Sequence, residues 1–185
     1  NRVTGYLNSE PYVRVLVLDY SKAFDTVRHT SFLSKLSKLD IPSEVFNWIA
    51  GYLEEHKQCT KIKGFVSTQK SITAGVIQGS ALGPAAFIIT ASDLTVSDGV
   101  NALEKYADDM YLIIHASNIH TTDCELAHVA AWDKENNLKF NKDKIMEIIF
   151  KSPRNTRSKT MLLPPELPGI TRVASHKILD VTLTN

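Results

Sequence analysis

Two adjacent acids interrupt an otherwise apolar run. Asp108 and Asp109 lie inside ALEKYADDMYLIIHA, residues 102–116. Adjacent carboxylates repel each other, and burying an unpaired charge costs several kcal/mol. A single buried strand through both acids is therefore unfavourable, and the run predicts two short strands that are joined through the acid pair. The pair is either an ordinary exposed turn, for which aspartate is well suited, or a place where a positively charged species binds.

The rest of the pattern predicts alternating strands and helices. YVRVLVLDY, residues 12–20, is rich in Val and Leu and predicts a buried strand that ends at an acid. Further strands are predicted over 58–66, 67–76, 144–150 and 176–183, and helices over 29–39 with Thr30 or Ser31 as N-cap, 43–55, 85–94, and 122–137 with a capping box from Thr122 to Glu125. Past residue 151, a polar, proline-rich segment predicts a mobile connection before the last short strand. The pattern is that of an α+β fold built from antiparallel strands and interspersed helices.

Composition excludes several classes of protein. The 185 residues fit one domain, and 43% hydrophobic with 22% charged residues is ordinary for a globular protein. No apolar run approaches the roughly 18 residues of a membrane span, and the first twelve residues do not resemble a signal peptide. Cys59 and Cys124 belong to no Cys-x-x-Cys spacing, which predicts reduced thiols. We therefore expect an intracellular protein of the nucleus or cytoplasm, neither secreted nor bound to a membrane.

The net charge of +1 does not by itself favour a nucleic-acid partner. Two segments, residues 56–70 and 151–159, each carry four Lys or Arg residues and no acid. Such segments are suited to contact phosphates, but a solvated strand edge or loop explains each of them equally well.

A second acid-bearing strand changes the interpretation of the acid pair. Asp19 ends the first predicted strand, and Asp25 follows six residues later. If that strand and the strand at Asp108 and Asp109 are neighbours in one sheet, three carboxylates gather at one place, and divalent cations would relieve their repulsion. Two Mg²⁺ ions about 3.5–4 Å apart form the site that activates a 3′-hydroxyl in nucleotidyl transfer. Hard oxygen ligands favour magnesium over zinc.

Five segments in order resemble the motifs of reverse transcriptases, and most closely those of non-LTR (LINE-type) retrotransposons. They are VLDYSKAFDTV, GVIQGSALGP, YADDMYL, NNLKFNKDKIMEIIF and HKILDVTL, and they extend from about Tyr12 to Leu183. The resemblance implies a polymerase palm, with an antiparallel sheet packed on helices and partial fingers. It also implies an RNA-directed DNA polymerase that uses two Mg²⁺ ions, with Mn²⁺ as an alternative. Its partners would be an RNA template, a DNA primer and deoxynucleoside triphosphates.

The resemblance assigns a role to each matching residue in the catalytic centre. Asp19 and Asp108 would be direct metal ligands, Asp109 would support the second metal or the primer end, and the carbonyl of Tyr20 would complete a metal shell. Lys144 would protonate or neutralise the departing pyrophosphate. A solvated lysine at the start of a strand is an equally good interpretation of Lys144.

Tyr20 and three further residues would bind the nucleotide. Phe24 would lie under the sugar and exclude a ribose 2′-hydroxyl, although its spacing alone favours an ordinary core aromatic. Gln78 would contact the template side, and Gly79 would allow a close backbone approach. Without the family, the glycines of this segment predict a plain turn before a helix.

The chain departs from the family at Ile77, where a proline is usual, at Ile145, where Thr or Ser is usual, and at Asp180, where a glycine is usual. Basic finger strands, a complete thumb and an endonuclease module are not expected in this chain. We predict that residues 1–150 form the palm with partial fingers. Residues 151–185 would be a proline-rich connection and a final strand that leads toward an absent thumb.

Such a fragment of a longer retroelement polyprotein would be weak or inactive alone, because positioning supplies most of the rate in this chemistry. The alternative function is that of a catalytically weak or inactive nucleic-acid-binding remnant. A palm shared with a cyclase or a maturase-like splicing factor is a third hypothesis. The Gln78–Gly79 loop and the YADD order disfavour the cyclase, and a maturase-like factor would need an RNA-binding extension that is not expected in this chain.

Overall fold

The computed structural model describes residues 2–76, 79–80, 82–141, 144–153, 162–178 and 181–184. The chain divides into two compact units. The first comprises Asn1–Ser21, Leu94–Glu135 and Lys139–Asn185, and the second comprises Lys22–Asp93 and Asn136–Leu138. The boundary predicted at residue 150, between the palm and the proline-rich connection, stays a prediction. No helix in the described ranges is long and apolar enough to cross a membrane.

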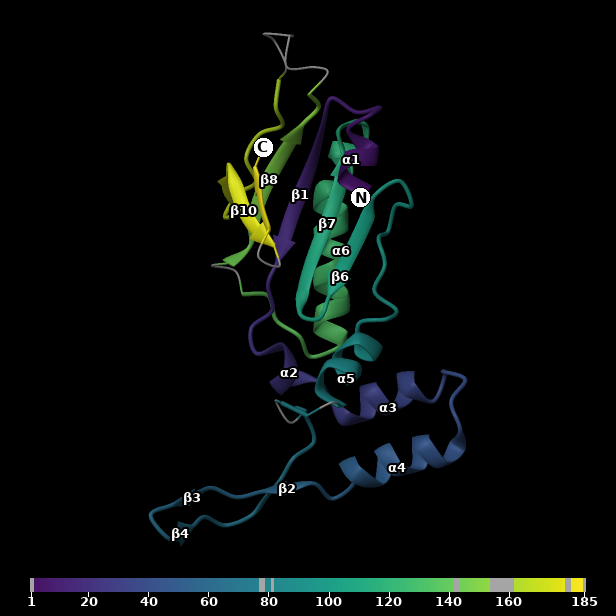
Figure 1. The fold of residues 1–185 in the computed structure, drawn as a ribbon, viewed down its shortest axis with the longest axis vertical. Helices are drawn as coiled ribbons and strands as arrows, with labels where there is room; N and C mark the ends of the chain where they lie inside the picture. The colour runs from purple at the N-terminus through teal and green to yellow at the C-terminus, as the bar shows by residue number, and fades with distance from the viewer. Residues whose placement is uncertain are drawn as a thin grey trace. The chain divides into compact units, whose positions relative to one another are not determined.

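The first unit contains a five-stranded sheet with the strand order β6-β7-β1-β8-β9 (Figure 1). Its strands are β1 (Tyr12–Leu18), β6 (Ala102–Tyr106), β7 (Asp109–His115), β8 (Met146–Lys151) and β9 (Thr171–Val173). All neighbours are antiparallel except β8 and β9, which are parallel. The sheet is therefore antiparallel except for one parallel pair at its edge. The sequence predicted only antiparallel strands, and it did not predict β9.

β1 is the central strand because it can bury both of its faces. All seven residues of YVRVLVL are buried, as a continuous apolar run predicts for a strand covered on both sides. On one face, Val13, Val15 and Val17 pack with Ala102, Tyr111, Ile113 and Ile148, and side chains of α1 (Arg2–Tyr6) and of Leu7 add to this cluster. α6 (Thr122–Glu135) lies behind the sheet in Figure 1. Helix α1 was not predicted.

A buried ion cluster crosses the other face of β1. The Glu147 carboxylate lies 2.6 Å from the Nε atom of Arg14 and 2.6 Å from the Nε atom of Arg172. Arg14 also donates to the Thr122 hydroxyl at 3.0 Å and to the Pro165 carbonyl at 2.9 Å. Burial lowers the pKa of Arg14, and the Glu147 carboxylate opposes that change. The cluster therefore fastens the proline-rich segment and β9 to the sheet.

The described residues of the second unit form four helices and a ribbon of two short antiparallel strand pairs. Its elements are α2 (Ala23–Thr26), α3 (His29–Leu36), α4 (Ser43–Leu53), β2 (Lys57–Gln58), β3 (Lys61–Ile62), β4 (Phe65–Val66), β5 (Lys70–Ser71) and α5 (Leu82–Thr90). Phe32, Leu36 and Phe87 are buried where α3 and α5 pack together. The predicted buried helix is confirmed in α5. The predicted antiparallel pairing is confirmed in the ribbon, where β2 pairs with β5 and β3 pairs with β4. The predicted extent of the two strands is wrong, because the turn at Lys63 and Gly64 lies inside the strand predicted over 58–66.

Two predicted caps are wrong. α3 begins at His29, and no side chain caps it. The His29 ring is instead buried, with Nε2 2.8 Å from the Gly75 carbonyl. At α6, the 3-10 helix η1 (Ala116–Thr121) runs directly into the first turn, so Thr122 donates back to the Ile119 carbonyl and does not cap. Glu125 accepts hydrogen bonds from the Ser97 and Asp98 amides, which lie outside the helix.

The end of the chain also differs from the prediction. The single strand predicted over 176–183 is a pair of antiparallel strands, β10 (Ser175–Ile178) and β11 (Val181–Thr184). Part of the predicted mobile connection, residues 154–161, lies outside the described residues, as does Asp180.

Candidate active site

Asp19 follows the last residue of β1, where the central strand leaves the sheet. Its side chain is 29% exposed. An antiparallel bridge fixes its backbone, because the Asn141 amide donates to the Asp19 carbonyl at 2.8 Å and the Ser21 amide donates to the Lys139 carbonyl at 2.9 Å. The segment that precedes β8 therefore sets where the Asp19 carboxylate can lie.

The acid pair lies at the turn between β6 and β7. Tyr106 pairs with Asp109, so Ala107 and Asp108 form a two-residue connection. Ala107 has φ 51°, a left-handed conformation that is uncommon outside glycine. The prediction of two strands joined through the acid pair is confirmed. Asp108 and Asp109 are both half-buried, and Asp109 is the first residue of β7.

The register between β1 and β7 brings the predicted carboxylates together. The last described pair is Leu18 with Met110, so one further step along both strands places Asp19 across from Asp109. Directly opposed residues have Cβ atoms about 4.5–5.5 Å apart. Burial raises the pKa of Asp109, and the carboxylates of Asp108 and Asp19 raise it further. Three acids from two distant segments are therefore close enough to repel one another at one end of the sheet.

Lys144 lies beside this group. Its ammonium nitrogen is 3.6 Å from Oδ1 of Asp19, and its side chain is 63% exposed. An ion pair with this exposure contributes about 0–1 kcal/mol to stability. Lys144 is therefore free to exchange Asp19 for another anion at little cost. Ile145, one of the departures from the family, is half-buried between Lys144 and β8.

The donor set suits a hard divalent cation, since it consists of carboxylates whose repulsion such an ion would relieve. Across the described ranges, however, no three acid, histidine or cysteine side chains converge closely enough to form a ready-made metal site. Asp19, Asp108 and Asp109 are the carboxylates at this end of the sheet that could hold such a cation.

Of the predicted nucleotide-binding residues, Phe24 and Gly79 belong to the second unit, whereas Tyr20 belongs to the first. Phe24, on α2, is half-buried, and its ring centroid is 5.5 Å from that of Phe87. Gly79 has φ 82°, a left-handed backbone conformation that favours glycine. Among the described residues, apart from its chain neighbours, no atom lies within 4 Å of where a Cβ would be, so there is room for a side chain at this position. Ile77 and Gln78 lie outside the described residues.

Sequence reasoning missed two tyrosine contacts near the carboxylates. Tyr111 hydrogen-bonds Asp109; burial and this carboxylate raise the pKa of Tyr111 to about 12. The sequence could have indicated this contact, because Tyr111 lies two residues after Asp109 and residues i and i+2 share a face of a strand. The prediction for Tyr20 concerned only its carbonyl. Its ring is buried, stacks on Phe140 at 5.1 Å, and donates its hydroxyl to Oδ1 of Asp133 at 2.6 Å.

The fold and the carboxylate group are those expected of a nucleotidyl-transferring palm, and comparison with known proteins identifies the family. The model of the family described as reverse transcriptase (RNA-dependent DNA polymerase) matches residues 5–163. The chain belongs to this family.

The similar curated proteins come from mobile elements. The chain is 29% identical, over 95% of its length, to the probable RNA-directed DNA polymerase from transposon BS of Drosophila melanogaster, of which it covers 20%. It is 30% identical, over 78% of its length, to the RNA-directed DNA polymerase from mobile element jockey of Drosophila funebris, of which it covers 17%. These relatives confirm the resemblance to non-LTR retrotransposons. The chain spans about a fifth of their length or less.

Solved structures share the fold. The apo telomerase of Candida tropicalis truncated from its C-terminal domain matches 99% of this chain with a TM-score of 0.65 and 12% identity, and 37% of that chain is covered. The telomerase of Candida albicans in complex with a TWJ fragment of telomeric RNA also matches 99%, with a TM-score of 0.60 and 15% identity, and 32% of it is covered. This likeness confirms the predicted α+β fold.

Proposed function

We propose that this chain is the catalytic palm portion of an RNA-directed DNA polymerase encoded by a retroelement. It extends the 3′-hydroxyl of a DNA primer with deoxynucleoside triphosphates, on an RNA template, as part of a longer polypeptide. Residues 1–150 act as palm with partial fingers, and residues 151–185 lead toward a thumb. The observation that carries the proposal is the β1–β7 register, which puts Asp19 across from Asp109 and next to Asp108.

Asp19 and Asp108 are the principal metal-holding groups, with Asp109 beside them and the carbonyl of Tyr20 available as a further oxygen donor. Divalent cations, Mg²⁺ first and Mn²⁺ as an alternative, supply charge neutralisation at the reacting phosphate and a more acidic 3′-hydroxyl when bound. Lys144 contributes differently. Its exposed ammonium group is weakly held by Asp19, so it can turn to the departing pyrophosphate and give it a proton.

The remaining residues act on the nucleotide. Phe24 presents a bulky ring under the sugar and disfavours a ribose 2′-hydroxyl. Gln78 hydrogen-bonds the template side, and the left-handed Gly79 lets the backbone of the same loop turn toward the nucleotide.

A primer-extension assay on an RNA template tests the proposal. Asp108→Asn removes one charge at nearly constant size, and Asp40→Asn, at an exposed position between α3 and α4, makes the same change elsewhere. Asp108→Asn should lower incorporation at least about a hundredfold, because each 1.36 kcal/mol of lost transition-state stabilisation is tenfold in rate. Equal incorporation by the two variants would remove Asp108 from the mechanism.

A second candidate is a nucleic-acid-binding remnant without catalysis. One observation favours it, since the carboxylates of the described residues do not converge into a metal cluster. It predicts salt-dependent binding of the template and no incorporation with either Mg²⁺ or Mn²⁺. Incorporation that needs Asp108 excludes it.

A further inference from the structure

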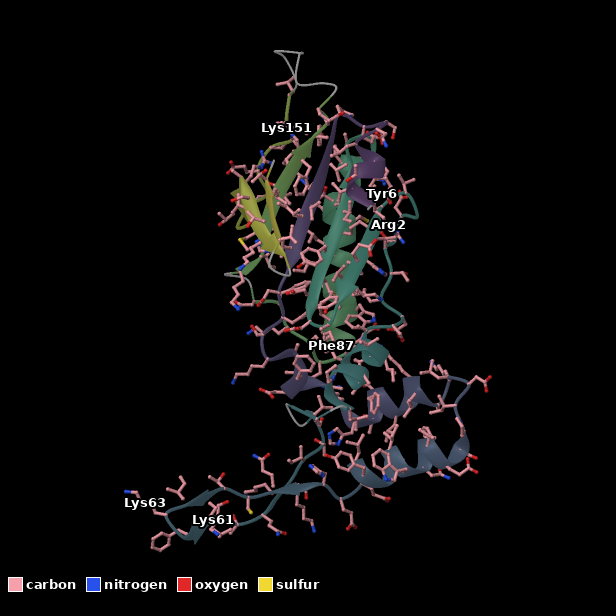
Figure 2. The ribbon with its side chains drawn as sticks, viewed as in Figure 1. Arg2, Tyr6, Lys61, Lys63, Phe87 and Lys151 are labelled. Carbon is pink, nitrogen blue, oxygen red and sulfur yellow. The ribbon has the colours of Figure 1, made fainter. Side chains whose placement is uncertain are left out.

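The ribbon of the second unit, residues 56–71, is an exposed strip of positive charge. Its sequence, HKQCTKIKGFVSTQKS, contains Lys57, Lys61, Lys63 and Lys70 and no acid. All four lysines are exposed, and none forms an ion pair with an acid of the described residues. Figure 2 shows Lys61 and Lys63 at the outer end of the ribbon. Unpaired lysines concentrated in this way attract a polyanion.

The outer end of the ribbon also exposes apolar side chains. Ile62 and Phe65 are directly paired across β3 and β4, and they are 64% and 83% exposed. Lys63 and Gly64 form the turn between them, with φ 48° and 88°, as a two-residue hairpin of the I′ type requires. The side chain of Phe65, next to this tight turn, is therefore largely open to solvent.

An aromatic stripe on α4 continues from the ribbon. Trp48 is 68% exposed, and its ring stacks on that of Tyr52 at 6.1 Å and 18°. Tyr52 in turn contacts the ring of His56 at 5.5 Å. Trp48 and Tyr52 are four apart and share one face of α4, whereas Ile49 and Leu53 are buried on another; His56 lies just past the end of the helix. The stripe is therefore a surface of flat rings that leads directly into the lysines.

We propose that α4 and the ribbon form a docking strip for a single strand of nucleic acid, with lysines on the phosphates and Trp48, Tyr52 and Phe65 as stacking platforms for bases. Charge complementarity identifies the partner, because four unpaired lysines without an acid fit a phosphate backbone. The exposed rings favour a single strand, since its bases have free faces and a duplex hides them. The inference deepens the proposed function, because it gives the template a contact surface, but the binding itself needs no catalysis.

The charge contribution is tested by fluorescence anisotropy with a labelled single-stranded RNA of mixed sequence, in chelator, at a series of salt concentrations. Lys61→Gln with Lys63→Gln should weaken binding and flatten the slope of log affinity against log salt by about 1.4, since each phosphate contact on a single strand contributes about 0.7. Lys38→Gln with Lys134→Gln, at exposed positions outside the strip, makes the same change in net charge and should leave the slope unaltered.

The stacking contribution is tested with Phe65→Leu, which keeps an apolar side chain and removes the ring. Affinity should fall at least about fivefold at an unchanged salt slope, because stacking of one base on an aromatic ring is lost. Leu39→Ala, at another exposed apolar position, is the matched control and should bind as the wild type does. Thermal unfolding of each variant establishes that the chain remains folded.

The proposal is overturned if the double lysine variant binds the RNA as its control does, or if Phe65→Leu has no effect. It is also overturned if the wild type binds a duplex RNA as tightly as the single strand. Asp108→Asn separates this inference from the proposed function, because that variant should bind RNA normally and fail only in primer extension. Loss of binding in the lysine variant, with no extension by the longer polypeptide that contains this chain, would sustain the docking strip and refute the polymerase.

Discussion

Asp133 on α6 should make the stability of this protein fall as the pH rises from about 4 to 7. The residue is 4% exposed. Its Oδ1 atom accepts a hydrogen bond from the Tyr20 hydroxyl at 2.6 Å, whereas Oδ2 is buried and has no hydrogen-bond partner among the described residues. Burial raises the pKa of Asp133 from its ordinary 3.8 to about 6, even though the Tyr20 hydrogen bond lowers it.

The magnitude follows from the two pKa values. A carboxyl whose pKa is raised by folding binds its proton more tightly in the folded state than in the unfolded state. Its contribution to stability is complete below the unfolded pKa of 3.8 and is lost as the pH passes through about 6. At 1.36 kcal/mol for each pKa unit, this difference costs the folded state about 3 kcal/mol at pH 7 relative to pH 3.

Urea unfolding of the wild type and of Asp133→Asn at pH 4, 5, 6 and 7 measures this cost. Asparagine has no charge to lose, so the variant should gain stability relative to the wild type by up to about 3 kcal/mol across this range. The quantity to follow is the difference in the free energy of unfolding between the two proteins at each pH. The titration of the other carboxyls is common to both proteins, and any cost of the amide does not change with pH, so neither alters the slope of this difference. Glu135→Gln, exposed on the same helix, is the control and should follow the wild-type curve.

Tyr20→Phe provides a second measurement, because it removes the hydrogen bond that lowers the Asp133 pKa. The loss of stability should then extend to higher pH than in the wild type. Parallel stability curves for the wild type and Asp133→Asn between pH 4 and 7 would refute the reasoning. They would mean that ionising Asp133 costs the folded protein no stability.

Three further changes test other parts of the structure. Lys144→Gln should slow incorporation about a hundredfold in single-turnover primer extension, as loss of a general acid does, and leave unfolding unchanged because Lys144 is exposed. Glu147→Gln leaves two arginines without their buried counter-ion and should lower the free energy of unfolding by about 3–5 kcal/mol in urea. Gly75→Ala should destabilise by about 1–3 kcal/mol, since Gly75 has φ +91° and a Cβ would lie 3.1 Å from the Asp25 carbonyl oxygen, whereas Gly51→Ala within α4 should stabilise slightly.

Each of these has a clear contrary result. Normal incorporation by Lys144→Gln would leave that lysine as a solvated side chain. A Glu147→Gln protein as stable as the wild type would mean that the ion cluster does not hold the sheet edge. Equal effects of alanine at positions 75 and 51 would show that the left-handed conformation carries no strain.

The parts of the fold that sequence predicted are those whose cause is local. β1 is a run of apolar and β-branched residues, and its burial follows from composition alone. The turn at Ala107 and Asp108 follows from the cost of burying adjacent acids. In each case a few neighbouring residues favour one conformation strongly.

The parts that sequence missed depend on distant partners. β9 is three residues long with a charge at its centre, and it joins the sheet where Arg172 reaches Glu147 on β8. Neither Arg172 nor Glu147 indicates a strand by itself, because the favourable ion pair requires both residues. The prediction of a Thr122 cap was wrong for a related reason. The preceding 3-10 helix already supplies the turn, and Glu125 contacts a loop that its local sequence does not indicate.

The candidate site combines both kinds of cause. That Asp19 and the acid pair end neighbouring strands was predictable from two apolar runs, but their spacing is fixed by the register of β1 on β7. That register is held by Val15, Val17 and Tyr111, which pack on one face of the sheet. Because side chains alternate along a strand, a slip of one residue would turn this apolar set to the opposite face and move Asp109 away from Asp19. The same contacts that bury the core therefore hold the carboxylates together, which is how a fold can keep mutually repelling acids close before any cation binds.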